Sequence, residues 1–193
     1  MSFTASLSQI VEDNENGLLA AHPGWTRVRL GDIAVVLNGF AFPSACFSQQ
    51  DGKPLLRIRD VLGSTTDAFY TGDYDPKYLV QTGDLVIGMD GDFNSALWKG
   101  PEALLNQRVC KVEPQEEFYS RAFLSYVLPG YLWAVNAKTS SVTVKHLSSL
   151  TVADIPLPLP PLPEQRRIVA KIEELFTQLD AGVAALRKVQ AQL

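Results

Sequence analysis

Apolar and polar residues alternate in short runs from Trp25 onward, and this pattern predicts several short strands separated by irregular loops. Val28 and Leu30 alternate with arginines, as in a half-buried strand. Gly31-Asp32 then opens a short apolar run that Asn38-Gly39 closes, and we expect a short helix there. The other predicted strands are each bounded by Gly, Pro, Asp or Asn, and they lie at 55–58, 84–89, 96–98 and 108–112.

The spacing of apolar residues becomes helical between Glu116 and Ala137. Because Pro129-Gly130 interrupts this region, the pattern predicts two helices around a break. The following residues, 138–143, are rich in hydroxyl side chains and predict a loop, which leads to a short segment ending near Asp154.

Proline recurs between residues 155 and 163, which read Ile-Pro-Leu-Pro-Leu-Pro-Pro-Leu-Pro. Proline fixes the backbone angle φ near −65° and has no N–H to donate. We therefore expect neither a sheet interior nor a helix, but an extended strap similar to polyproline.

A long helix is predicted from 164 to 193, with Pro163 in its first turn and Glu164 at the positive end of the helix dipole. Its apolar residues recur at steps of four and three, with Gly182 at the one missing position, and form a coiled-coil seam: Ile168, Ile172, Leu175, Leu179, Leu186, Val189 and Leu193. Counted from Pro163, the helix would extend about 46 Å at 1.5 Å per residue. The seam predicts a partner helix; the alternative is a helix packed back on its own domain.

These patterns predict an α+β protein with four parts. A polar leader at 1–24, which caps the domain or frays, precedes a mixed-sheet domain at 25–154. A proline-rich strap at 155–163 and a dimerisation or spacer helix at 164–193 follow.

The composition narrows the classes of protein. The 17 Lys and Arg residues against 21 Asp and Glu residues give a formal net charge of −4, so any nucleic-acid surface must be local. The two cysteines, Cys46 and Cys110, suggest neither a zinc site nor a disulfide framework. The longest aliphatic stretch, 33–37, is far short of the roughly 18 residues of a membrane span, and the first residues do not read as a secretory signal. We expect a cytoplasmic protein with no membrane partner.

The segment 155–175, IPLPLPPLPEQRRIVAKIEEL, closely resembles the junction between a target-recognition domain and the spacer helix in the DNA-specificity (S) subunit of Type I restriction-modification systems. Several upstream segments resemble the same family in the same order, so the resemblance covers about 25–193: Trp25 to Asp32, Gly39 to Ser44, Leu55 to Asp60, Gly83 to Val86 and Leu105 to Val109.

Members of that family usually carry two recognition domains and two helices, and this chain has one of each. The resemblance implies either the N-terminal half of an S subunit or a natural half-subunit whose helix pairs with a second copy. It implies that the chain reads one half of a bipartite target in double-stranded DNA and docks methyltransferase (M) and restriction (R) subunits. It also implies a non-catalytic chain without a cofactor of its own, with S-adenosylmethionine, ATP and magnesium on the partner subunits.

Catalytic motifs give weak signals. Asp75-Pro76-Lys77-Tyr78 lacks the second proline of the adenine-methylation motif. Asp90-Gly91-Asp92, with Asp84 nearby, either holds magnesium for phosphodiester cleavage or forms a tight turn. His22 and His146 have no Ser, Cys or Asp at a recognisable triad spacing.

DNA recognition requires guanidinium and amide groups at base edges and cations and hydroxyls at phosphates. The first candidate loop is 138–146, and the second is 106–108, which abuts a strand. The third is 92–95 with Lys99, and two arginines predicted to share one face of a strand are further candidates. Phe40, Phe42 and Phe47 are read as anchors of a loop to the core. The candidate DNA-binding residues are Lys138, Thr139, Ser140, Ser141, Thr143, Lys145, His146, Asn94, Lys99, Gln107, Arg108, Arg57 and Arg59.

Two other functions stay open. The chain is alternatively a non-DNA-binding interaction module that tethers or inhibits a partner through its C-terminal helix, which the negative net charge favours. A stand-alone nuclease that uses Asp90 and Asp92 is a weaker alternative.

Overall fold

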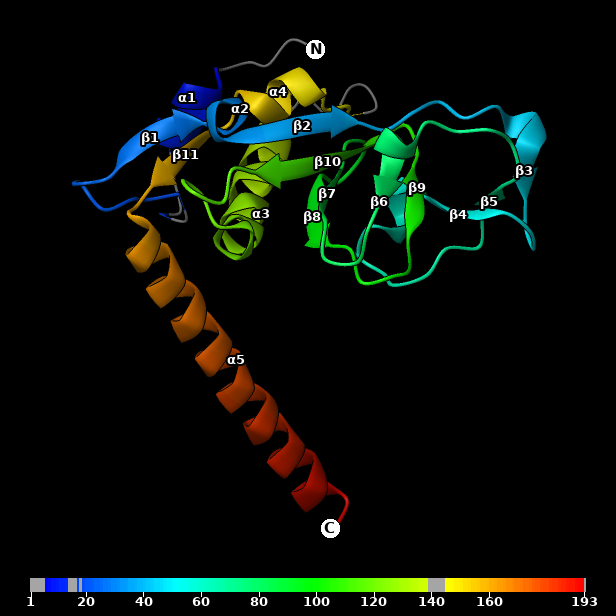
Figure 1. Cartoon of the computed structure of the whole chain (residues 1–193). Coiled ribbons are helices and arrows are strands. Elements are labelled where there is room, and N and C mark those ends of the chain that lie inside the picture. Colours follow the sequence, from blue (N-terminus) through cyan, green and yellow to red (C-terminus); the bar gives the residue numbers. More distant parts are fainter. Residues whose placement is uncertain (1–5, 14–16, 18, 139–144, 193) are drawn as a thin grey trace.

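The computed structural model describes residues 6–13, 17, 19–138 and 145–192. These residues form a body of sheets and helices and a single long helix, α5 (Leu162–Gln190), which projects from the body (Figure 1). The α+β class and the long C-terminal helix that the sequence predicts are therefore confirmed. Among the described residues, no helix combines the length and the hydrophobicity that a lipid bilayer requires.

A four-stranded antiparallel sheet forms the centre of the body, and its strands follow the order β2-β10-β7-β8. Their bounds are Ala34–Asn38, Val109–Pro114, Leu85–Gly88 and Asn94–Leu97, respectively. The largest core cluster lies between one face of this sheet and helix α3 (Arg121–Ala137), where Leu124, Leu128 and Leu132 are fully buried.

A five-stranded mixed sheet lies beside it, at the far end of the body from the β1–β11 ribbon (Figure 1). Its strand order is β3-β5-β4-β9-β6, and only β4 and β9 run parallel. The strands are β3 (Phe47–Ser48), β5 (Phe69–Tyr70), β4 (Lys53–Leu56), β9 (Ala103–Leu105) and β6 (Leu79–Val80). Short 3-10 helices lie between them: η1 (Ser44–Cys46), η2 (Ile58–Asp60) and η3 (Pro76–Tyr78).

The apolar run after Gly31-Asp32 is a strand, and the short helix predicted there is wrong in position. One helical turn, α2 (Leu30–Ile33), precedes the run, and the β-branched residues Val35 and Val36 belong to β2. Pairing with β10 decides the conformation, because β-branched side chains fit the pleated surface of a sheet well.

The two helices predicted around Pro129 are one continuous helix, α3. Proline removes one backbone N–H and usually kinks a helix. Here Leu128, Tyr131 and Leu132, on both sides of Pro129, are buried in the same core cluster. This shared burial holds the two halves of the helix together across the missing hydrogen bond.

The proline strap is extended, as the sequence predicts, and part of it pairs as a strand, which the sequence did not predict. β11 (Pro156–Leu159) pairs antiparallel with β1 (Thr26–Arg29) in a two-stranded ribbon. Leu30 donates its N–H to the Ile155 carbonyl at 2.9 Å, so the alternation of the ladder places Pro156 and Pro158 at non-hydrogen-bonded positions. The missing N–H groups therefore cost no ladder hydrogen bonds.

The leader and the segment before the strap also form helices that cover the body. In α1 (Leu7–Asp13), Ile10 and Val11 are buried, and α1 packs against α3 and β11. The short helix α4 (Ser149–Ala153) buries Val152 and packs against β2. Both helices add apolar side chains to the core around α3.

Candidate nucleic-acid interface

The predicted loop 106–108 and the segment 57–59, which carries the two candidate arginines, leave the five-stranded sheet at the same edge. β4 and β9 are parallel neighbours, with Leu56 opposite Leu105, so their C-terminal ends lie together. The segments 57–59 and 106–108, which follow these strands, therefore emerge side by side. The Asn106 N–H donates to the Leu56 carbonyl at 3.2 Å, directly across this edge.

The 106–108 turn is clamped to Phe40 and holds Arg108 in an unusual conformation. Arg108 has φ of +73°, and it is the one non-glycine residue with positive φ among the described residues. The Gln107 N–H donates to the Phe40 carbonyl at 2.9 Å. Gly39 permits this clamp, because a Cβ at that position would lie 2.0 Å from the Asn106 carbonyl oxygen. Left-handed backbone at an arginine is strained, and such residues concentrate at functional sites.

Arg108 meets two residues from distant segments, Asp90 and His146. The Arg108 Nη1 atom lies 3.2 Å from Asp90 Oδ2 and 3.2 Å from His146 Nδ1. His146 Nδ1 lies 2.5 Å from Asp90 Oδ1, and an isolated β-bridge joins the two residues. The carboxylate thus orients both side chains, while about half of the Arg108 side chain stays exposed (50%).

Backbone contacts bring the end of the 138–146 loop to the same place. The Gly91 N–H donates to the Lys145 carbonyl at 3.0 Å, and the Leu147 N–H donates to the Met89 carbonyl at 2.6 Å. The Lys145 ammonium donates to the carbonyl of Asn136 at 2.9 Å, at the C-terminal end of α3. The residues 139–144 lie outside the described part of the chain, and with them the predicted contacts of Thr139, Ser140, Ser141 and Thr143. Lys138 is the C-terminal capping residue of α3.

A shallow polar cavity of about 340 Å³ opens at this cluster. The side chains of Gln107, Arg108 and His146 line it together with groups that sequence reasoning missed, which are Asn38, Ser148 and Ser149. Hydroxyl, amide, imidazole and guanidinium groups on one concave surface are the donors and acceptors that nucleic-acid recognition uses. We call this surface, formed by Asn38, Gln107, Arg108, His146, Ser148 and Ser149, the polar rim.

The third candidate segment is only partly a loop, because it runs from the connection after β7 into β8, and it does not come together with Lys99. Phe93 is buried in the core, and Asn94 begins β8, where its Oδ1 atom is buried with no hydrogen-bond partner among the described residues. Lys99 is exposed beyond the opposite end of that strand. Five residues of extended chain separate the two by roughly 16 Å.

The two arginines after β4 have different environments, and the predicted shared strand face is wrong because the strand ends at Leu56. Arg57 forms ion pairs with Asp60 and Asp67 around η2. Burial lowers the pKa of Arg57, but its hydrogen bonds to the two carboxylates outweigh that effect and leave the pKa raised. Arg59 is exposed at the edge that the 106–108 turn shares. Arg57 thus stabilises the turn, whereas Arg59 points to solvent.

The acidic and aromatic residues that the sequence singled out have other partners. Asp84 lies 3.6 Å from Lys111 and 3.5 Å from Arg121, whereas Asp90 contacts Arg108 and His146. No group of three His, Cys, Asp or Glu side chains within the described ranges is arranged to hold a metal ion. Phe42 is buried, whereas Phe40 and Phe47 are partly exposed around it and Tyr70.

The helix α5 leaves the body with its apolar seam uncovered over most of its length (Figure 1). Ile168 and Ile172 are half-buried near the body, whereas Leu175, Leu179, Leu186 and Val189 are 51–67% exposed. Leu193 lies outside the described residues. A second exposed stripe, formed by Phe176 and Val183, lies beside the seam. Val169, Phe176 and Val183 are seven residues apart, and this heptad spacing in the sequence indicates the stripe, which the predicted seam does not include.

Residues 23–186 match the family model described as Type I restriction modification DNA specificity domain. The chain is similar to the EcoBI specificity subunit of Escherichia coli, with 50% identity over 190 residues, which covers 98% of this chain and 40% of that protein. The EcoAI specificity subunit of Escherichia coli is 30% identical over 169 residues, covering 79% of this chain and 28% of that protein. The chain thus spans less than half the length of these relatives.

Solved structures show the same fold. The HsdS subunit from Thermoanaerobacter tengcongensis superposes with a TM-score of 0.65 at 20% identity, covering 91% of this chain and 46% of that chain. The S subunit of the Type I restriction-modification system from M. genitalium gives a TM-score of 0.61 at 12% identity, with the same coverage of 91% and 46%.

Proposed function

Because the chain belongs to the family of Type I restriction-modification DNA specificity domains, we propose that it reads one half of a bipartite target in double-stranded DNA. The observation that carries this proposal is the division of the molecule into two parts (Figure 1). The body of sheets and helices, which we call the recognition head, carries the polar rim, and the projecting helix carries an exposed apolar seam. A protein that recognises two half-sites must hold two recognition heads at a fixed distance, so it needs both parts.

The polar rim is the proposed DNA-contacting surface, with Lys145, Lys138 and Arg59 beside it as the phosphate-binding cations. Arginine and glutamine form bidentate hydrogen bonds to guanine and adenine in the major groove, and Gln107 and Arg108 supply these two groups side by side. The strained Arg108 backbone and the Asp90 carboxylate support a fixed direction for the guanidinium group. Arg57, which is paired with two carboxylates, and Asn94, which lies in β8, have positions that support structural roles instead, and Lys99 lies beyond the other end of β8.

The helix α5 is the proposed spacer. Its 29 residues extend about 44 Å, more than the about 34–36 Å of one duplex turn. Its seam is proposed to pair with a second helix of the same kind, from a second copy or from a second half of a longer subunit. Two heads on a paired spacer would then contact half-sites on the same side of the duplex.

Catalysis is proposed to belong to methyltransferase and restriction subunits, with S-adenosylmethionine, ATP and magnesium bound there. The names of the similar proteins, all specificity subunits, support this division. The complex would act on DNA in the cytoplasm. An interaction module that has lost DNA affinity is the second candidate, because the formal net charge of −4 disfavours contact with phosphates.

Selection from a random DNA pool by the chain together with its methyltransferase subunit tests the proposal. We expect enrichment of two short half-sites at a fixed gap. Binding to the selected target should weaken with salt, with a slope of log K against log salt of about −0.9 for each phosphate contacted. No enrichment and no salt-sensitive binding would favour the interaction module. Magnesium-dependent cleavage of plasmid by the chain alone would contradict the non-catalytic assignment.

A further inference from the structure

The side chain of Gln165 lies at the base of α5 and is completely buried, at 0% exposure. The Ser120 N–H, at the start of α3, donates to its Oε1 atom at 2.8 Å. Its Nε2 atom donates to the carbonyls of Phe118 and Pro160, both at 2.9 Å. One amide therefore joins the segment before α3, the proline strap and the first turn of the spacer helix.

This arrangement satisfies both N–H groups and the carbonyl of the Gln165 amide. A buried polar group is costly unless it is hydrogen-bonded, and amide hydrogen bonds require distances near 2.9 Å and nearly linear geometry. All three bonds form only when the first turn of α5 has one position and one direction relative to residues 118–120. Gln165 is thus an orientation constraint as well as a buried contact.

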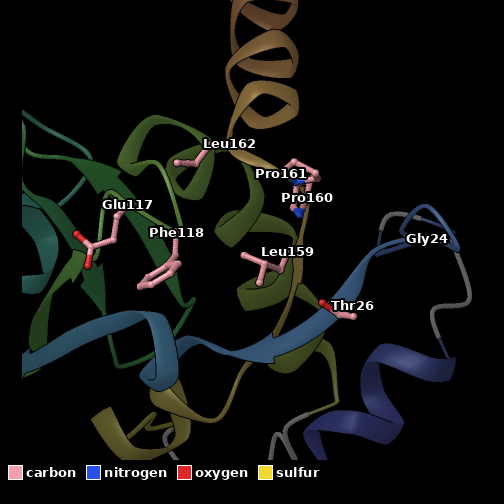
Figure 2. Close-up of a pocket in the computed structure, with 8 residues that line it drawn as sticks. All are labelled: Gly24, Thr26, Glu117, Phe118, Leu159, Pro160, Pro161 and Leu162. Atoms are coloured by element: carbon pink, nitrogen blue, oxygen red, sulfur yellow. The ribbon is translucent and has the colours of Figure 1, made fainter.

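The other contacts at the base of α5 constrain its direction less. On one side, a cavity of about 430 Å³ opens where the paired strands β1 and β11 meet the segment before α3, and Thr26, Phe118, Leu159 and Pro161 are among the residues that line it (Figure 2). On the body side, Val169 is the last buried residue of the helix. Beyond it, the Tyr126 and Phe176 rings approach to 6.4 Å between centroids, and the helix then continues free of the body.

The length of the helix amplifies any change in its direction. The end of α5 lies 25 residues beyond Gln165, which is about 38 Å at 1.5 Å per residue. A tilt of about 10° at the base would move this end by roughly 6–7 Å. That displacement equals about two base-pair steps of 3.4 Å.

We propose that Gln165 is a positioning residue that fixes the angle between the recognition head and the spacer helix, and thereby sets the gap that the protein accepts between half-sites. This inference rests on the proposed function for its consequence at DNA, whereas the mechanical part concerns the chain alone. It adds a specificity determinant that contacts no DNA.

The mechanical part is tested by distance measurements between two spin labels in the full chain. The labels are placed at exposed Lys99 in the head and exposed Arg187 in the helix, in a Cys46→Ser background. Labelled chains are diluted with unlabelled chains so that only distances within one chain are recorded. Gln165→Met keeps the side-chain length and removes all three hydrogen bonds. Gln178→Met makes the same chemical change at an exposed position of the same helix.

We expect a narrow distance distribution in the unsubstituted background and in Gln178→Met, and a distribution at least twice as wide in Gln165→Met. A residue with a purely structural role would lower the melting temperature without widening the distribution, and that result would overturn the inference. Equal widening in both variants would overturn it as well. If Gln165→Met does not fold, Gln165→Asn, whose amide is one methylene too short to reach all three partners, gives the same comparison.

The consequence at DNA is measured on selected targets whose gap is changed by one or two base pairs, with the methyltransferase subunit present. The unsubstituted chain should prefer one gap, and Gln165→Met should reduce that preference at least tenfold while Gln178→Met keeps it. Unchanged gap preference in Gln165→Met would overturn the inference while leaving the proposed function intact. Absence of bipartite binding by the unsubstituted chain would instead refute the proposed function, and the label distances would still decide the mechanical part.

Discussion

The carboxylate of Asp90 lies 2.5 Å from Nδ1 of His146, which is 56 positions further along the chain. A carboxylate at the proposed DNA-contacting surface would repel phosphate, so its presence there requires a compensating role. The same carboxylate contacts Arg108, and its side chain is only 22% exposed. Asp90 is therefore placed to orient the side chains of Arg108 and His146 rather than to contact DNA itself.

Replacement of Asp90 by alanine should weaken binding to the selected target by about 10- to 100-fold, because Arg108 and His146 lose their common anchor. Binding to unrelated DNA should stay the same or strengthen, since a negative charge is removed from the surface. Competition gel shifts with specific and unrelated duplexes measure both effects.

Asp92→Ala is the matched control, because it removes the same charge from a neighbouring exposed position that contacts Asn136 and neither Arg108 nor His146. Equal losses of specific binding in the two variants would mean that the contacts of Asp90 with Arg108 and His146 are not the cause of the loss, and the orienting role of Asp90 would be wrong.

Arg108 has a left-handed backbone, so two substitutions can separate the cost of backbone strain from the proposed role of the guanidinium group at DNA. Arg108→Gly and Arg108→Ala should both lose about 1–3 kcal/mol of target discrimination, because both remove the guanidinium group. Arg108→Gly should nevertheless be about 1 kcal/mol more stable than Arg108→Ala, since glycine adopts positive φ without strain. Urea unfolding measures the free energies, and an alanine variant as stable as the glycine variant would contradict the strain.

Local pattern predicted the elements whose conformation depends on their own residues. The heptad spacing and the proline in the first turn predicted α5, and each predicted strand lies within a few residues of an observed one, which is β1, β4, β7, β8 or β10. The pattern did not predict β2, β3, β5, β6, β9 and β11 as strands. Two features that the sequence did not predict, the continuous helix through Pro129 and the strand pairing at Pro156, have a common cause. In each case burial or strand pairing with residues far along the chain outweighed a local preference against the element.

The candidate interface was predictable in its residue types but not in its assembly. Polar residues after β9 and before α4 indicated Gln107, Arg108 and His146. Nothing local connects these residues with Asp90, because the parallel pairing of β4 with β9 and the bridge from Asp90 to His146 depend on tertiary structure. Likewise, Gln165 reads as an ordinary exposed glutamine in a helix until its three partners are seen.

The exposed seam of α5 gives a prediction about association. Leu179→Asp places a charge in the seam and should abolish pairing of the helix, while the thermal unfolding of the head stays unchanged. Ala184→Asp makes a similar change at an exposed position about 140° away around the helix, and pairing should survive. Sedimentation of each variant measures the mass, and an assembly that persists in Leu179→Asp would show that the seam is assigned wrongly.

Burial of Cys110 in the central sheet predicts how stability depends on pH. Burial raises the pKa of the Cys110 thiol from 9.0 to about 12, so the folded protein keeps the thiol protonated where the unfolded chain loses its proton. Below pH 9 both states are protonated and the thiol contributes no pH dependence. Between pH 9 and 12 the thiolate favours the unfolded chain, and the stability contribution falls by about 1.4 kcal/mol per pH unit.

The Cys110→Ala variant has no thiol to titrate at this position. Comparison with it therefore isolates the contribution of the Cys110 thiol to the pH dependence of stability. The stability advantage of the unsubstituted protein over Cys110→Ala should be about 1.4 kcal/mol smaller at pH 10 than at pH 8. Urea unfolding at the two pH values measures the difference, in which the titration of the lysines and tyrosines cancels. The same comparison with Cys46→Ala, at a half-buried position, serves as the control. A pH-independent difference for Cys110→Ala would contradict the buried thiol, because a residue whose pKa is the same in both states adds no slope.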